Sequence, residues 1–237
     1  MMPVYQLTLR QLAGKWRLAI MLVLALLPVA ITTMMLADRR TLTVQEYETA
    51  VLSAMLAGSI LPLVVLAISG PAFANETEDR TLANLTLSPL PRWKIVVPKL
   101  LAAITIALPF TAVSAALTAH IAFTADIKAT VAVAIGAAAG VAMYAAFFVY
   151  LGLVTAHAIG MGLLYVVLWE GFISGFVSGV QVLSVRHYAI AWMHGLDARR
   201  FAETTLPSFG TAIGVLMVVV IGFTLLSIRR LRRMDVP

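Results

Sequence analysis

The chain contains no cysteine, and charged residues make up only 12% of its 237 residues. The absence of cysteine excludes a disulfide scaffold, a thiolate nucleophile and any metal site built on cysteine ligands. Soluble domains carry roughly 25% charged and roughly 45–50% apolar residues. Here the hydrophobic share is 61%, so the composition predicts a protein embedded in a lipid bilayer.

Motifs that carry enzyme chemistry are also missing. The phosphate-loop pattern Gly-x4-Gly-Lys-Ser/Thr does not occur, because Gly14-Lys15 is followed by Trp16. Neither GxSxG nor HExxH is present. The four histidines form no i,i+4 pair with a carboxylate nearby. We therefore expect no catalytic residue, no bound metal and no enzymatic activity on this chain.

The net charge of +6 does not indicate nucleic acid as a partner. Grooves that bind nucleic acid interleave basic with aromatic side chains, and this sequence lacks that pattern. In membrane proteins an excess of Lys and Arg gathers in cytoplasmic loops and sets the orientation. The basic excess is therefore interpreted as a topology signal.

Windows without Asp, Glu, Lys or Arg divide the chain into helices of the 20 or so residues that a crossing needs. The window 129–169 is too long for one helix and predicts a hairpin of two. The sequence thus predicts an all-α membrane protein with a single transmembrane domain over residues 1–237. Its segments are an interfacial helix at 4–17, six spans at 18–37, 50–74, 96–120, 128–155, 159–184 and 208–228, a cytoplasmic loop at 75–95, an external segment at 185–207 and a basic tail at 229–237.

The orientation follows from counting Lys and Arg. With the N-terminus inside, eleven of the 17 basic residues fall in cytoplasmic segments and six in external ones. The positive-inside rule therefore favours a multi-pass protein of the cell membrane with both termini in the cytoplasm. The cluster Arg229, Arg230, Arg232 and Arg233 is the strongest anchor and also suits anionic lipid headgroups.

Glu170 lies about 14 Å along its predicted helix, which is near the middle of the membrane. A carboxyl group at that depth is costly and is usually functional or paired. Two kinds of role for Glu170 stay open. It could contact substrate, relay protons or link two copies of the chain, or it could make a structural hydrogen bond to Ser174 or a neighbouring helix. The run Gly171, Gly175 and Gly179 beside it favours close helix packing, within the chain or between two copies.

Residues 75–99 form the largest cytoplasmic loop. An acidic first turn with Glu76 and Glu78 suits a helix N-terminus. Leu82 and Leu85 then give a short apolar edge, and prolines follow. An acidic face disfavours contact with the negative inner leaflet, so this segment predicts a helix that binds a protein partner.

The loop also resembles a known family. The run Glu76, Glu78-Asp79-Arg80-Thr81-Leu82, then Ser88-Pro89, Arg92-Trp93-Lys94 and Lys99-Leu100-Leu101, is similar to the cytoplasmic loop of ABC type-2 exporter permeases. Leu151-Gly152-Leu153, Leu164-Tyr165-Val166, Leu168-Trp169-Glu170 and Ser184-Val185-Arg186-His187-Tyr188 fit the same family. The resemblance covers nearly the whole chain.

This resemblance implies a membrane subunit without an ATPase domain. Such permeases have six membrane helices, pair as homo- or heterodimers and bind a separate ABC ATPase subunit, which holds ATP and Mg. The resemblance places a coupling helix in the loop and implies ATPase-coupling roles for Glu76, Glu78, Arg80, Thr81, Leu82, Leu85, Pro89 and Arg92.

The expected function is therefore ATP-driven export, in contact with membrane lipid. The alternative is a secondary transporter or channel that uses Glu170 as an intramembrane polar group. That class usually needs several intramembrane charges or inverted repeats, and Glu170 is the one acidic residue within the predicted spans.

Overall fold

The computed structural model describes residues 2–37, 47–78, 91–124, 126–174, 179–198 and 206–233. All regular structure in these ranges is helical. The elements are α1 (Met2–Leu12), α2 (Lys15–Ala37), η1 (Glu48–Ile60), α4 (Leu61–Ser69), α5 (Pro71–Glu78), α7 (Trp93–Ala122), α8 (Ile127–Val154), α9 (Ala158–Leu164), η2 (Tyr165–Ile173), η3 (Gln181–Leu183), α11 (Val185–Leu196) and α12 (Phe209–Arg233).

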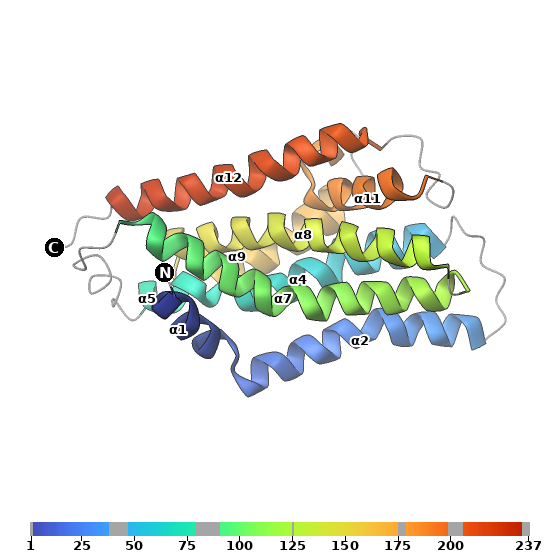
Figure 1. Cartoon of the computed structure of the whole chain (residues 1–237), viewed down its shortest axis with the longest axis horizontal. Helices are drawn as coiled ribbons and strands as arrows, with labels where there is room; N and C mark the ends of the chain where they lie inside the picture. Colours follow the sequence, from blue (N-terminus) through green and yellow to red (C-terminus); the bar gives the residue numbers. More distant parts are fainter. Residues whose placement is uncertain are drawn as a thin grey trace.

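Long helices run along the long axis of the molecule, with α8 at the centre (Figure 1). Five helices of the described chain are long and apolar enough to cross a membrane: Lys15–Ala37, Thr49–Ser69, Trp93–Ala122, Ile127–Val154 and Phe209–Arg233. Two-thirds of α8's most apolar window is buried (67%), against 11% for α12. α8 is therefore the core of the bundle, while α12 lies at its edge with an apolar surface turned outward.

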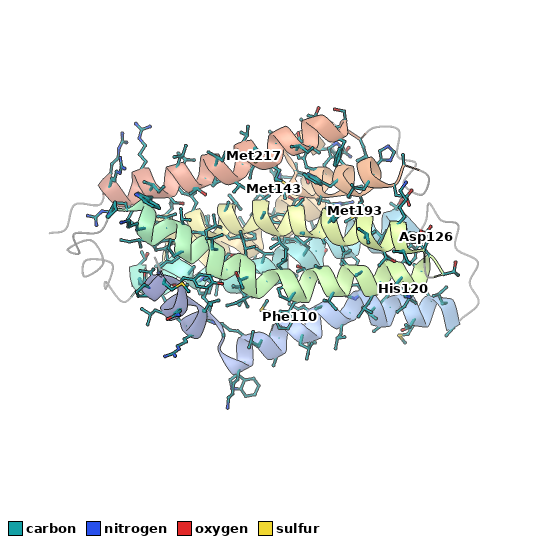
Figure 2. The ribbon with its side chains drawn as sticks, in the orientation of Figure 1. Phe110, His120, Asp126, Met143, Met193 and Met217 are labelled. Atoms are coloured by element: carbon teal, nitrogen blue, oxygen red, sulfur yellow. The ribbon has the colours of Figure 1, made fainter. Side chains whose placement is uncertain are left out.

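The sequence of α8 explains its central place. Asp126 caps its start by accepting hydrogen bonds from the backbone N–H groups of Lys128 and Ala129, which satisfies donors that the first turn leaves free. The helix is rich in Ala and Gly, so neighbours approach its backbone closely. Met143 is buried against Tyr188 of α11 and Ala212 of α12, and Figure 2 shows it near the middle of the bundle.

The second span changes helix type along its length. η1 is a π-helix of 13 residues, and α-helical geometry resumes at Leu61. Pro62 stands at the start of α4 inside the continuous helix Thr49–Ser69, so its missing N–H removes one backbone hydrogen bond where the two helix types meet. η2 is also a π-helix and contacts η1. Single π-helical turns inside α-helices are frequent at functional sites.

The fifth predicted span, 159–184, differs from the structure. A helix of α9 and η2 runs from Ala158 to Ile173, and Gln181–Leu183 form a 3₁₀ turn. The external segment predicted at 185–207 begins with α11, which packs against α8. The physical reason is the apolar side of α11, which buries Ala189, Ile190 and Met193 among others.

The boundary near the N-terminus also differs. The expected interfacial helix at 4–17 ends earlier, because α1 stops at Leu12 and α2 begins at Lys15. Gly14 has open space around it and lowers helix propensity between the two elements. Trp16 is 84% exposed in the first turn of α2, a position that suits an aromatic anchor at a membrane interface.

Gly136 and Gly140 of α8 are contact points within the chain. A Cβ on Gly136 would overlap Met193 and the backbone oxygen of Ala189, and one on Gly140 would lie 3.2 Å from Leu61. These glycines therefore admit α11 and α4 to the surface of α8.

Gly152, near the end of α8, gives a direct test of this packing. An added Cβ would overlap the backbone oxygen of Gly70 and lie 3.3 Å from the Ala74 nitrogen, and backbone atoms cannot move aside cheaply. We expect Gly152→Ala to lower the free energy of unfolding by about 1–3 kcal/mol, measured by denaturant unfolding in detergent. Gly222→Ala on α12 is the matched control, since no atom lies within 4 Å of its added Cβ. Equal stability of both variants would contradict this packing.

Candidate functional site

A buried ion pair joins α5 to α7 beside the predicted coupling segment. The side chain of Lys99 on α7 is 2% exposed, and its Nζ lies 2.5 Å from Oε1 of Glu76 on α5. Nζ also donates a hydrogen bond of 2.6 Å to the Ala72 carbonyl oxygen. It sits 4.3 Å from the ring centroid of Phe73. One ammonium group thus contacts three residues of α5: Ala72, Phe73 and Glu76.

The pair is arranged to keep a charge stable away from water. Burying an unpaired ammonium costs several kcal/mol, which a close carboxylate and a carbonyl acceptor offset. The aromatic face of Phe73 adds an electrostatic attraction. The second oxygen of Glu76, Oε2, is buried and has no hydrogen-bond partner in the described part of the chain. Glu76 therefore faces inward to Lys99, and one of its acceptors remains available.

The predicted ATPase-coupling residues fall into two groups. Glu76 lies on α5, and Glu78 is the last residue of that helix. Arg92 immediately precedes α7, and its carbonyl oxygen accepts hydrogen bonds from the N–H groups of Ile95 and Val96. Arg80, Thr81, Leu82, Leu85 and Pro89 lie outside the described residues.

The two described ends of this segment are held firmly. α5 ends at Glu78 and α7 begins at Trp93, and the Lys99–Glu76 pair connects them. Both lie at the end of the bundle where α1 lies (Figure 1). The Lys99–Glu76 pair therefore ties the start of α7 to α5.

A second polar cluster surrounds Glu170 on η2. Its carboxylate accepts hydrogen bonds from the Tyr165 hydroxyl (3.1 Å), from the Val185 backbone N–H (3.2 Å) and from the Ser184 hydroxyl. The side chain is fully buried. Ser174 bonds to the Glu170 backbone oxygen instead (2.8 Å). The Glu170 carboxylate is therefore hydrogen-bonded within the chain, to its own helix η2 and to the start of α11.

Arg186 makes the reciprocal connection from α11. Its Nη1 donates to the Glu170 backbone oxygen at 3.4 Å, while Nε and Nη2 donate to the Ser53 hydroxyl oxygen on η1 at 3.1 and 2.7 Å. Gly58 leaves room for the side chain: a Cβ there would lie 3.1 Å from Cδ of Arg186. Arg186 thus crosses the surface of η1 at a glycine.

The two charged side chains of this cluster lie at helix ends of opposite partial charge. Ser184 and Val185 begin α11, so the Glu170 carboxylate lies at an N-terminus, where N–H groups concentrate positive partial charge. Arg186 donates to a carbonyl in the last turn of η2, where negative partial charge gathers. Each charged side chain therefore stabilises the end of the neighbouring helix: Glu170 the start of α11, and Arg186 the end of η2.

The three predicted packing glycines have no close neighbour where they are described. A Cβ on Gly171 would meet only the Val166 backbone oxygen at 3.6 Å, and one on Gly179 would meet nothing within 4 Å. Gly175 lies outside the described residues. Packing within the described chain thus does not account for Gly171 and Gly179.

Lys99 and Arg186 belong to runs that carry the family resemblance, but the sequence assigns no individual role to either of them. The position of Lys99 does indicate burial. It follows Pro98 and precedes an apolar run, so it lies inside the membrane helix once this stretch is helical. For Arg186 no local pattern reveals the contact, because Ser53 is 133 positions away.

Comparison with protein families places this geometry in a known group. Residues 14–185 match the family model described as ABC-2 family transporter protein. The match includes the Lys99–Glu76 junction and extends to Val185 at the start of α11. A search of curated proteins found no match. Since the matched region covers most of the 237 residues, the chain is a multi-pass membrane protein that belongs to the ABC-2 transporter family and serves as a transport subunit.

Proposed function

We propose that this chain is the permease subunit of an ATP-driven ABC exporter. It works with a separate ABC ATPase subunit that holds ATP and Mg, and it carries no cofactor itself. The observation that carries the proposal is the Lys99–Glu76 pair within the family match. A permease that is driven by a separate ATPase subunit needs a firm connection between the loop that the ATPase contacts and a membrane helix.

The proposed topology has six crossings, with both termini in the cytoplasm of a cell-membrane protein. Five long helices supply five crossings, and the shorter apolar helix Ala158–Ile173 supplies the sixth. The C-terminal end of α12 lies at the same end of the bundle as α1 (Figure 1), as an even number of crossings requires. The arginines at the end of α12 support placing that end inside.

We further propose that two permease copies pair through the α9–η2 face. Leu164 and Leu168 are exposed large apolar side chains on that face, and a Cβ on Gly171 would meet no atom closer than the Val166 backbone oxygen at 3.6 Å. Small residues beside apolar ones let two helices approach closely in a bilayer.

The proposed transport cycle transmits motion from loop to bundle. ATP binding draws two ATPase subunits together, and the coupling segment between α5 and α7 follows them. Lys99 and Glu76 convert that displacement into a tilt of α7. Because α7 packs on α8 and α2, its tilt changes the bundle. A ligand-driven switch of this kind needs contacts that differ between two states, and the ATPase contact supplies them.

The coupling segment gives the decisive experiment. A tagged chain is purified with its ATPase subunit, and vanadate-sensitive ATP hydrolysis is measured in nanodiscs. We expect Leu82→Asp with Leu85→Asp to reduce recovery of the ATPase at least tenfold, because two charges replace the apolar edge that docks. The matched control is Leu82→Met with Leu85→Met, which should keep the complex. Intact recovery with the aspartate pair would refute the docking assignment.

A further inference from the structure

A polar cavity of about 90 Å³ lies beside the Glu170 cluster. Polar side chains from η1, the end of η2, η3 and the start of α11 line it: Ser53, Ser174, Gln181, Ser184, Arg186 and His187. A volume of this size holds several water molecules or one compact polar group. Nothing in the ion pair at Lys99 or in the proposed coupling segment uses this cavity.

The cavity wall offers hydrogen-bond donors. Arg186 has five N–H groups, and the three hydrogen bonds to Ser53 and Glu170 leave two of them for a ligand. Ser53 is more than nine-tenths buried and accepts both bonds from Arg186, so its hydroxyl hydrogen is also available. It has no acceptor in the described ranges.

The charge of Arg186 is not neutralised by direct pairing. Within the described parts of the chain, no carboxylate lies within 4 Å of its guanidinium group. The carboxylate of Glu170 already accepts three hydrogen bonds from Tyr165, Ser184 and Val185. A planar guanidinium group matches the oxygens of phosphate and carboxylate. The cavity therefore favours an anionic group.

Apolar side chains stand next to the lining residues along the chain. Ile173 precedes Ser174, and Val182 and Leu183 lie between Gln181 and Ser184. Val182 is 58% exposed and Leu183 is 70% exposed. Exposed apolar residues that adjoin the lining residues in sequence offer a surface for the apolar chain of a molecule whose charged head enters the cavity.

We propose that this cavity binds the anionic phosphate or carboxylate headgroup of an amphiphile, with its alkyl chain against Val182 and Leu183. Arg186 and Ser53 hold the headgroup oxygens. Gly58 matters because it lets the Arg186 side chain lie across η1 at the cavity. This inference rests on the proposed transport function and names the class of its cargo.

The test measures binding to the full chain without any ATPase subunit. Radiolabelled dodecyl phosphate is titrated onto the chain in phosphatidylcholine nanodiscs, and binding to empty nanodiscs is subtracted. We expect saturable binding that Arg186→Gln weakens at least tenfold. Arg186→Lys, which keeps the charge but loses the planar fork, is expected to weaken it less. Lys128→Gln, an exposed cation away from the cavity, is the matched control and should change it less than twofold.

Two further probes keep the proposal falsifiable if Arg186→Gln folds poorly. Dodecyltrimethylammonium has the same chain with a cationic head, and equal binding of both amphiphiles to the wild-type chain would overturn the proposal. Competition by inorganic phosphate tests whether the cavity binds an amphiphile headgroup or a free anion. If it competes as strongly as dodecyl phosphate, the alkyl chain adds nothing and the amphiphile assignment is wrong. Loss of the ATPase complex would refute the proposed function while leaving this binding measurement unaffected.

Discussion

Lys99→Met is expected to lower the free energy of unfolding by about 3–5 kcal/mol, the usual cost of removing one partner from a buried ion pair. The substitution leaves the Glu76 carboxylate without its cation, 2.5 Å from where Nζ stood. It also removes the hydrogen bond to the Ala72 carbonyl oxygen. Methionine has nearly the same volume as lysine, so the loss of stability reports the removal of the ammonium charge and not of packing. Denaturant unfolding of the purified chain in mixed micelles measures it.

A double-mutant cycle separates the pair from its surroundings. Lys99→Met combined with Glu76→Leu removes both charges, and we expect it to recover most of the lost stability, because apolar replacement of a whole buried pair is often neutral. Lys94→Met is the matched control in the first turn of α7. Within the described ranges its ammonium contacts the Trp93 ring, 5.7 Å from the centroid, so a cost of about 1 kcal/mol or less is expected. Additive losses in the double variant would show that the two side chains are independent.

Glu170→Ala is expected to lower the free energy of unfolding by about 2–4 kcal/mol. It removes the acceptor for the Tyr165 hydroxyl, the Ser184 hydroxyl and the Val185 N–H. Each buried donor left without a partner costs about 1–3 kcal/mol, and repacking recovers part of that sum. The same unfolding assay measures the effect.

Two companion variants test whether the carboxylate acts as the acceptor for α11. Glu170→Gln keeps one acceptor oxygen and should lose less stability than Glu170→Ala. Ser174→Ala removes only a bond to a backbone oxygen in the same helical turn and should cost about 1 kcal/mol or less. If Glu170→Ala unfolds at the same denaturant concentration as the wild-type chain, the carboxylate does not hold η2 to α11.

The long helices could be predicted from the sequence because each is an apolar window with charges near its ends. α7, α8 and α12 cover the ranges 96–120, 128–155 and 208–228 to within a few residues. In a bilayer, unsatisfied backbone groups are so costly that a continuous apolar window has little choice but to be helical. The family resemblance rested on short local runs, which the sequence also displays directly.

The break in the fifth span could not be predicted, because apolar content does not distinguish one continuous helix from two pieces. The pieces are fixed by contacts distant in sequence: Arg186 reaches Ser53 on η1, and α11 packs on α8. Lys99 presents the same difficulty. Its pairing with Glu76 across 23 positions decides that a basic residue is buried.

The two π-helical segments have a mechanical consequence. η1 carries Ser53 and η2 carries Glu170, and the two segments are in contact. Ser53 accepts two hydrogen bonds from Arg186, whose third hydrogen bond goes to the Glu170 backbone oxygen. A change in the winding of either π-helical segment would therefore break one of these bonds, so the winding of the second span is coupled to that of η2.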